Sequence, residues 1–212
     1  MDSAHLERFA GIGRLYGRAG MERLAGASFM VVGLGGVGSW TAEALARSGI
    51  GHLALVDGDS VCVSNTNRQL HAVAGNVGKA KTTAVAERAR AIHPAIRTTE
   101  HARFLSRFNP HEVLAGFDGV VIDAMDALSP KCGLIAEAVN RKLPVVTVGG
   151  CAGYQFGSDR AAVIDDHRLP KTATNLLCNQ ARNNVIGAAR RDSNDAHRFD
   201  RIGLRKHCAR YT

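Results

Sequence analysis

The sequence has few aromatic residues, no closely spaced cysteine pair and no long apolar run. Phe, Trp and Tyr make up only 5% of its 212 residues, which suits close packing of helices on a sheet better than an aromatic-rich β-sandwich. None of the five cysteines forms a Cys-x-x-Cys pair, so the common zinc patterns are excluded. No run approaches the roughly 20 apolar residues that span a bilayer, and the N-terminus lacks a signal-peptide core. These absences predict a soluble cytoplasmic protein with reduced, mostly structural cysteines.

Apolar runs alternate with helical patterns through the first 150 residues. The runs predicted to be strands cover residues 28–33, 52–57, 96–102, 117–123 and 143–148. The segments predicted to be helices cover residues 37–48, 79–92 and 130–141, and a long polar connection covers residues 58–78. Apolar strands separated by helices are typical of a parallel sheet that is covered on both faces. We therefore predict an α/β fold with a Rossmann-like, doubly wound, mostly parallel sheet.

The chain divides into two parts by composition. Residues 1–150 carry the alternating pattern and form the predicted nucleotide-binding domain, whereas residues 151–212 show little periodicity. The second part holds 11 Lys/Arg and 6 Asp/Glu, within a total formal net charge of +8. Such a basic segment favours a phosphate-rich partner such as RNA, although a solvated helical face has the same composition. We expect a diverged C-terminal segment that completes or covers the site, or forms a poorly ordered tail.

A glycine-rich stretch, Gly33-Leu34-Gly35-Gly36-Val37-Gly38, joins the first predicted strand to the helix that follows it. Missing side chains let backbone N–H groups approach an anion, and the helix N-terminus adds partial positive charge. The stretch therefore predicts a phosphate cradle. Asp57 ends the second strand 24 residues after Gly33, where an acidic residue of a dinucleotide enzyme holds a ribose hydroxyl. These residues alone leave NAD and ATP open.

The polar connection after Asp57 discriminates between the two nucleotides. It contains Ser64-Asn65-Thr66-Asn67-Arg68-Gln69 and then Gly78-Lys79-Ala80-Lys81. An enzyme that handles ATP must neutralise the phosphates and the charge that develops at the α-phosphate and the pyrophosphate leaving group. Arg68 and Lys81 suit that work, whereas an NAD dehydrogenase has no obvious need for this loop. We therefore favour ATP.

The fourth predicted strand ends in Asp123-Ala124-Met125-Asp126, which places two carboxylates at its carboxyl end. Ligands of open α/β sheets bind at the carboxyl ends of the strands. Asp126 is the candidate ligand for a Mg²⁺ ion that bridges the phosphates, because hard cations prefer oxygen ligands. For Asp123 we favour a structural role as the cap of the following turn.

Taken together and in order, five segments resemble the adenylating-enzyme family that includes ubiquitin-activating enzymes and the bacterial molybdopterin- and thiamine-pathway adenylyltransferases. The segments are residues 33–38, 55–57, 64–69, 77–81 and 123–126. The resemblance implies binding of ATP and Mg²⁺, with Asp126 beside the metal and Arg14 reaching into the partner subunit's site in a homodimer. Arg68, Lys81, Asp126 and Arg14 are then the catalytic candidates. The implied nucleotide-binding residues are Gly33, Gly35, Gly36, Gly38, Asp57, Asn65, Asn67, Arg68 and Lys81.

Within that family, residues 8–17, 37–40 and 59–69 are similar to the bacterial branch that acts on tRNA. This resemblance implies ATP-dependent dehydration of N6-threonylcarbamoyladenosine beside the anticodon. The carboxylate of that nucleoside is activated by adenylation, and an internal nucleophile then displaces the activating group and closes a ring. It also implies tRNA as substrate and sulfur-transfer proteins as further partners, since Cys208 corresponds to a cysteine proposed to handle sulfur in relatives.

Three alternatives stay open beside this interpretation. The chain could be an adenylyltransferase for a sulfur-carrier protein, or a non-catalytic relative that binds nucleotide or RNA. An NAD dehydrogenase is a distant fourth hypothesis, because no catalytic Ser/Tyr/Lys arrangement is evident.

Residues 149–155 depart from the family's glycine-rich segment, with Cys151 inserted and Tyr154 in place of a glycine.

Overall fold

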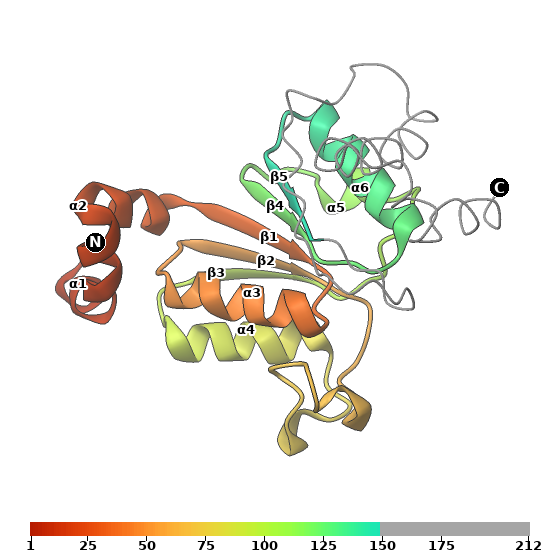
Figure 1. Ribbon diagram of the computed structural model, residues 1–212, viewed down its shortest axis with the longest axis horizontal. Helices are drawn as coiled ribbons and strands as arrows, with labels where there is room; N and C mark the ends of the chain where they lie inside the picture. The colour runs from red at the N-terminus through yellow and green to blue at the C-terminus, as the bar shows by residue number, and fades with distance from the viewer. Residues whose placement is uncertain (149–212) are drawn as a thin grey trace, which may run out of the picture. The chain divides into compact units, whose positions relative to one another are not determined.

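Five parallel strands form the framework of the computed structural model, which describes residues 1–148 (Figure 1). They are hydrogen-bonded in the order β3-β2-β1-β4-β5, which is the strand order of a dinucleotide-binding Rossmann sheet as far as it extends. Their bounds are β1 (Ser28–Val32), β2 (His52–Val56), β3 (Arg97–His101), β4 (Val120–Asp123) and β5 (Val145–Thr147). The predicted fold class is therefore confirmed, and the four pairings between these five strands are all parallel.

Helices cover both faces of this sheet (Figure 1). On one face, α3 (Gly36–Arg47) and α4 (Lys81–Ile92) bury Ala46 and Val85 against Val31 and Leu55 of the strands. On the other face, the short α5 (Pro110–Val113) and α6 (Leu128–Asn140) pack on the alternate strand residues. These alternate residues are Met30, Val32, Ala54, Val56, Val121 and Val145. Because successive side chains point to opposite faces of a strand, the continuous apolar runs fill both cores.

The connection between β2 and α4 is long and largely irregular, as its polar sequence predicts. It contains two single-turn 3₁₀ helices, Val63–Asn65 and Ala74–Asn76. The following helix was expected to begin at Lys79, but α4 begins at Lys81. Ala80 instead forms an isolated antiparallel bridge with Ser60, and the carbonyl of Lys79 accepts from the Val61 N–H. The backbone of residues 79–80 therefore holds the connection in place by pairing with residues 60–61 instead of continuing the helix.

Two N-terminal helices, α1 (Ser3–Arg8) and α2 (Ala10–Gly26), were not predicted. The end of α2 lies where the strands begin, because the His52 N–H donates to the carbonyl of Ala27. Their sequence has weak helical periodicity, and Gly17 interrupts α2 with a φ of 71°. Phe9, which joins the two helices, is buried, and the centroid of its ring lies 4.9 Å from that of the His93 ring.

No helix among residues 1–148 is long and apolar enough to cross a membrane. Residues 149–212 are outside the described part of the chain, and with them the predicted C-terminal segment, Cys151, Tyr154 and Cys208. The predicted boundary near residue 150 therefore stays a prediction.

Two glycines allow β1 to run directly into α3. Gly33 has a φ of 88°, a conformation that L side chains rarely adopt. A Cβ on Gly38 would lie 1.7 Å from the carbonyl oxygen of Gly33, so the first turn of α3 passes against the end of β1 with no room for a methyl group. By contrast, a Cβ on Gly35 would meet nothing within 4 Å. Packing therefore requires a glycine at position 38, whereas position 35 has room for a side chain.

This contrast predicts unequal effects of alanine on stability. Gly38→Ala should lower the free energy of unfolding by about 3 kcal/mol, because backbone atoms must move to accept the methyl group. Gly35→Ala, the matched control, should lower it by less than about 1 kcal/mol. Urea unfolding of both variants measures the difference. Equal losses would show that the close approach at Gly38 does not constrain the fold.

Candidate nucleotide-binding site

The candidate site begins at the loop between β1 and α3, at the carboxyl edge of the sheet. The Gly33 N–H donates to the carbonyl of Val56 at 2.8 Å, which aligns the start of the loop with the end of β2. No side chain caps the first turn of α3, whose N-cap residue is Gly35. The amide groups of that turn are therefore available to an anion, and the helix dipole favours negative charge there.

Asp57 holds the glycine loop from the neighbouring strand. One oxygen of its carboxylate accepts from the Leu34 N–H at 2.7 Å, and the other accepts from the Asp59 N–H at 2.8 Å. These two bonds leave lone pairs of the Asp57 carboxylate for the predicted ribose contact, because a carboxylate has about four lone-pair positions. Asp57 is thus a structural anchor at the position where a ribose-binding carboxylate is expected.

Lys81 lies at the first residue of α4 and pairs with Asp59. Its Nζ donates to the Asp59 carboxylate at 2.8 Å, and the Lys81 side chain is only 6% exposed whereas that of Asp59 is 53% exposed. Lys81 is therefore a buried, held cation whose partner faces solvent. Asp59 was not among the predicted site residues. Its sequence signals are its place two residues after Asp57 and its inclusion in residues 59–69, which resemble the tRNA-acting branch.

Arg68 lies beside the glycine loop. A Cβ on Gly36 would be 3.4 Å from the Arg68 Cγ, so the aliphatic part of this arginine packs on the loop. Its Nη1 donates to the carbonyl of Ser64 and to the Asn67 side chain, at 3.2 and 3.0 Å. The Trp40 indole N–H donates to the Arg68 carbonyl at 3.1 Å. The exposed guanidinium is thus oriented by contacts from α3 and from its own loop.

Asn65 and Asn67 both shape this loop. The Asn65 side-chain oxygen accepts from the Cys62 N–H at 3.0 Å and closes the first 3₁₀ turn. Asn67 accepts from Arg68, as described above. Their predicted contacts with nucleotide stay predictions, and the contacts observed are ones that position Arg68.

His71 is a site neighbour that sequence reasoning missed. It is 1% exposed, and neither ring nitrogen has a hydrogen-bond partner among residues 1–148. Burial lowers the pKa of His71, and the charge of Lys81 lowers it further while Asp57 opposes the change. The ring is therefore neutral near pH 7 and adds no charge beside Lys81. A single histidine carries no signal in the sequence, because its neighbours come from distant segments.

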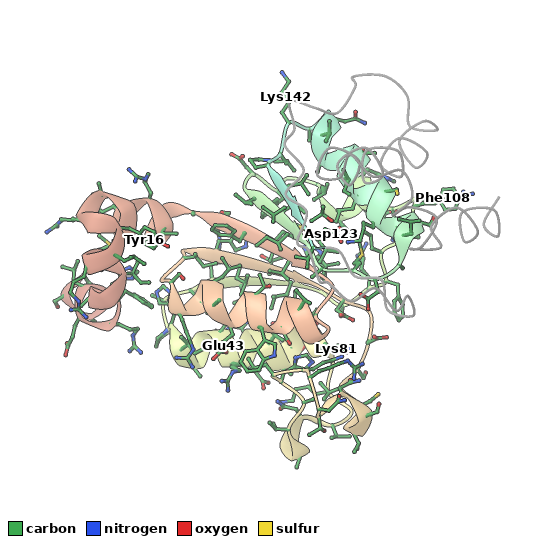
Figure 2. The ribbon with its side chains drawn as sticks, viewed as in Figure 1. Tyr16, Glu43, Lys81, Phe108, Asp123 and Lys142 are labelled. Atoms are coloured by element: carbon green, nitrogen blue, oxygen red, sulfur yellow. The ribbon has the colours of Figure 1, made fainter. Side chains whose placement is uncertain are left out.

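The two carboxylates at the carboxyl end of β4, Asp123 and Asp126, have different environments. Asp123 is fully buried, and its carboxylate accepts from the Lys131 ammonium, the Thr147 hydroxyl and, at 3.1 Å, the Met125 N–H. It therefore caps the turn, as predicted, and also forms a buried ion pair with α6. Asp126 is exposed and has no hydrogen bond or ion pair within the described residues. Asp123 is the last residue of β4 and is labelled in Figure 2.

Arg14 is not brought to this edge within one chain. It is an exposed residue of α2, and α2 ends where β1 and β2 begin. The structure therefore brings together the glycine loop, Asp57, Arg68 and Lys81, while Arg14 lies on an element at the opposite edge. This separation agrees with the predicted role of Arg14 in a partner subunit's site, which stays a prediction.

A strand that enters a helix through a glycine loop, held by an acidic residue of the next strand, defines a Rossmann-like nucleotide-binding protein. The chain belongs to the ThiF family, whose sequence profile matches residues 9–192. The family resemblance expected from the motifs is thus confirmed.

Relatives with curated names extend this result. The chain is 45% identical over 182 residues to tRNA threonylcarbamoyladenosine dehydratase of Escherichia coli, a match that covers 86% of the chain and 66% of the relative. The enzyme of the same name from Haemophilus influenzae is 47% identical over 148 residues, 69% of the chain and 56% of the relative. A maize adenylyltransferase and sulfurtransferase, MOCS3-2, is 39% identical over 140 residues, 66% of the chain and 29% of the relative.

Solved structures agree with the sequence matches. The crystal structure of the E. coli dehydratase has a TM-score of 0.70 and 48% identity, and the match covers 73% of the chain and 64% of that protein. The same enzyme in complex with ATP also gives a TM-score of 0.70. The chain spans between about half and two thirds of the length of the dehydratases that it matches.

The environment of Asp123 predicts a large cost for removing its partner. Lys131→Met should lower the free energy of unfolding by about 3–5 kcal/mol, because it leaves a buried carboxylate uncompensated. The exposed pair of Lys79 and Glu87, 2.7 Å apart, provides the control. Lys79→Met should cost no more than about 1 kcal/mol in the same urea titration. A cost for Lys131→Met as small as that of the control would contradict the structural role of Asp123.

Proposed function

We propose that this protein uses ATP to activate the carboxylate of N6-threonylcarbamoyladenosine in tRNA and so promotes its dehydration to a cyclic form. The observation that carries this proposal is the meeting of the glycine loop, Asp57, Arg68 and Lys81 at one edge of the sheet. Support comes from the dehydratases to which the chain is similar, one of which has been crystallised with ATP and with AMP.

The residues fit the demands of adenylation. Hydroxide is a poor leaving group, and transfer of AMP to the carboxylate turns that oxygen into a good one. Attack at the α-phosphate places new negative charge on the phosphate and on departing pyrophosphate, which fixed cations stabilise. We assign this work to Arg68 and Lys81, with the phosphates cradled by Gly33, Gly35, Gly36 and Gly38 and the ribose held by Asp57. Asp59 holds Lys81 in place until the phosphates compete for it.

Mg²⁺ fits the same arrangement with Asp126 as its protein ligand. No group of three or more His, Cys, Asp or Glu residues in the described part of the chain could hold a metal alone. Mg²⁺ is usually bound by one or two carboxylates together with substrate phosphates and water. Among residues 1–148, Asp126 has no ion pair, whereas Asp123 at the end of β4 is paired with Lys131. When bound, the ion would neutralise phosphate charge.

A cytoplasmic homodimer completes the proposal. Arg14 would serve the site of the partner subunit, and two large apolar side chains beside it are exposed, Leu15 by 69% and Tyr16 by 60%. An exposed apolar stretch on α2 is what a subunit contact through this helix would cover. Sulfur-transfer proteins, the other partner class expected from the sequence, depend on Cys208, which is outside the described residues.

Lys81 should matter for ATP binding more than its neighbour Lys79 does. Lys81→Met removes a held cation from the phosphates and should weaken ATP affinity roughly tenfold to a hundredfold, the range of a hydrogen bond to a charged group. Lys79→Met should change the affinity less than about threefold, since Lys79 pairs with Glu87. Isothermal titration with ATP measures both. Similar affinities for the two variants would remove Lys81 from the phosphate site.

The activity itself is tested on tRNA that carries N6-threonylcarbamoyladenosine. With ATP and Mg²⁺, the purified protein should convert this nucleoside to the cyclic form and release AMP, as read by nucleoside analysis. Arg68→Ala should slow conversion on the order of a hundredfold, the effect of losing one transition-state donor. An unchanged nucleoside, together with adenylation of a carrier protein that ends in Gly-Gly, would instead favour the sulfur-carrier function suggested by the maize relative.

A further inference from the structure

The loop between β3 and α5 exposes two phenylalanines in a chain that has few aromatic residues. Phe104 is 69% exposed and Phe108 is 71% exposed. The other phenylalanines of the described residues, Phe9, Phe29 and Phe117, are buried or half-buried. Exposed rings four residues apart cost free energy in water, so their exposure points to a partner. We call residues 104–108 the stacking loop.

The stacking loop is held in shape by Asn109. The Asn109 side chain donates to the carbonyl of Phe104 at 3.1 Å and accepts from the Ser106 N–H at 2.7 Å. The Phe108 N–H donates to the Ser106 hydroxyl at 3.2 Å. Pro110 then begins α5, and its fixed φ limits movement at that end. A partner therefore meets a loop whose backbone is held in advance, which lowers the entropy cost of binding.

The stacking loop borders the candidate nucleotide site. The Phe104 ring lies on Gly58, where a Cβ would be 2.5 Å from the ring, and Gly58 directly follows Asp57. At the other end of the loop, the Arg107 backbone packs against Gly133 of α6. Figure 2 shows Phe108 beside α6, directed away from the sheet. A molecule bound across these rings would have its reacting group near the glycine loop.

Arg107 gives this surface its chemical character. Its guanidinium lies 4.4 Å above the centre of the Phe108 ring, and no carboxylate pairs with it within residues 1–148. The charges nearest in sequence, Arg103 and Glu112, neutralise each other across 3.1 Å. Aromatic rings stacked with a free guanidinium are the groups that bind unpaired RNA bases and the adjoining phosphate. A purely apolar protein partner would leave the Arg107 charge without a counterion.

We infer that the stacking loop binds unpaired bases of the tRNA anticodon loop, an inference that rests on the proposed function. Phe104 and Phe108 stack on bases, and Arg107 contacts the phosphate backbone. This surface holds the RNA beside the nucleotide, so that the activated nucleoside reaches the α-phosphate.

The test is the affinity of the full chain for a fluorescent anticodon stem–loop RNA, measured by anisotropy at several salt concentrations. Phe108→Ala should weaken binding roughly fivefold to a hundredfold, the range for one stacked base, while Phe108→Tyr should retain it. Arg107→Ala should weaken binding and lower the salt slope by about one. Arg97→Ala is the matched control, since Arg97 is an exposed arginine at the opposite edge of the sheet. Its backbone N–H donates to the Gly51 carbonyl, a bond that the alanine variant keeps.

Unchanged RNA affinity in the Phe108→Ala and Arg107→Ala variants would overturn the inference, as would a wild-type chain that binds no RNA. ATP affinity in both variants should equal that of the wild type, and a parallel loss of ATP binding would also contradict the assignment. Weaker adenylation of a carrier protein with unchanged RNA binding would assign the surface to a protein instead. If loop-dependent RNA binding is found but the nucleoside is never converted, the proposed function fails while this inference stands.

Discussion

The bonds of the Asp57 carboxylate to two backbone N–H groups are the interaction on which the site depends. They connect the loop after β1, through Leu34, with the segment after β2, through Asp59. Asp59 in turn holds Lys81, which opens α4. One carboxylate thus sets the separation between the glycine loop and the buried cation. Without these hydrogen bonds, the glycine loop and the Lys81 ammonium would lie on segments that are no longer linked through Asp57, although the five strands could remain paired.

Charge in this region is divided between structural and available groups. Asp123 and Lys131 satisfy each other in the interior and are not free for a ligand. Arg68 and Asp126 are exposed, while Lys81 is buried with a partner that faces solvent. His71, neutral beside Lys81, avoids a second positive charge in the same space. Arg68 and Asp126 therefore remain accessible for the proposed binding of phosphate and its counterion, whereas Asp123 and Lys131 pair with each other within the fold.

The sequence predicted the sheet and the glycine loop because both have local signatures. Apolar runs gave β1 and β2 nearly to the residue, and the spacing of the glycines gave the start of α3. Helices α1 and α2 were missed because their stability comes from packing of residues such as Phe9 and His93. The pairing of Asp59 with Lys81 and the burial of His71 were missed for the same reason, since these partners meet only after the 58–80 connection folds back. Contacts between distant segments leave no periodic pattern.

In the proposed function, this edge of the sheet directs attack to the α-phosphate of ATP. Exchange of radiolabelled pyrophosphate into ATP, in the presence of tRNA carrying N6-threonylcarbamoyladenosine, tests it most directly. Reversible adenylation predicts label in ATP that depends on the modified tRNA. Release of orthophosphate from ATP with no exchange would place the chemistry at the γ-phosphate and contradict attack at the α-phosphate.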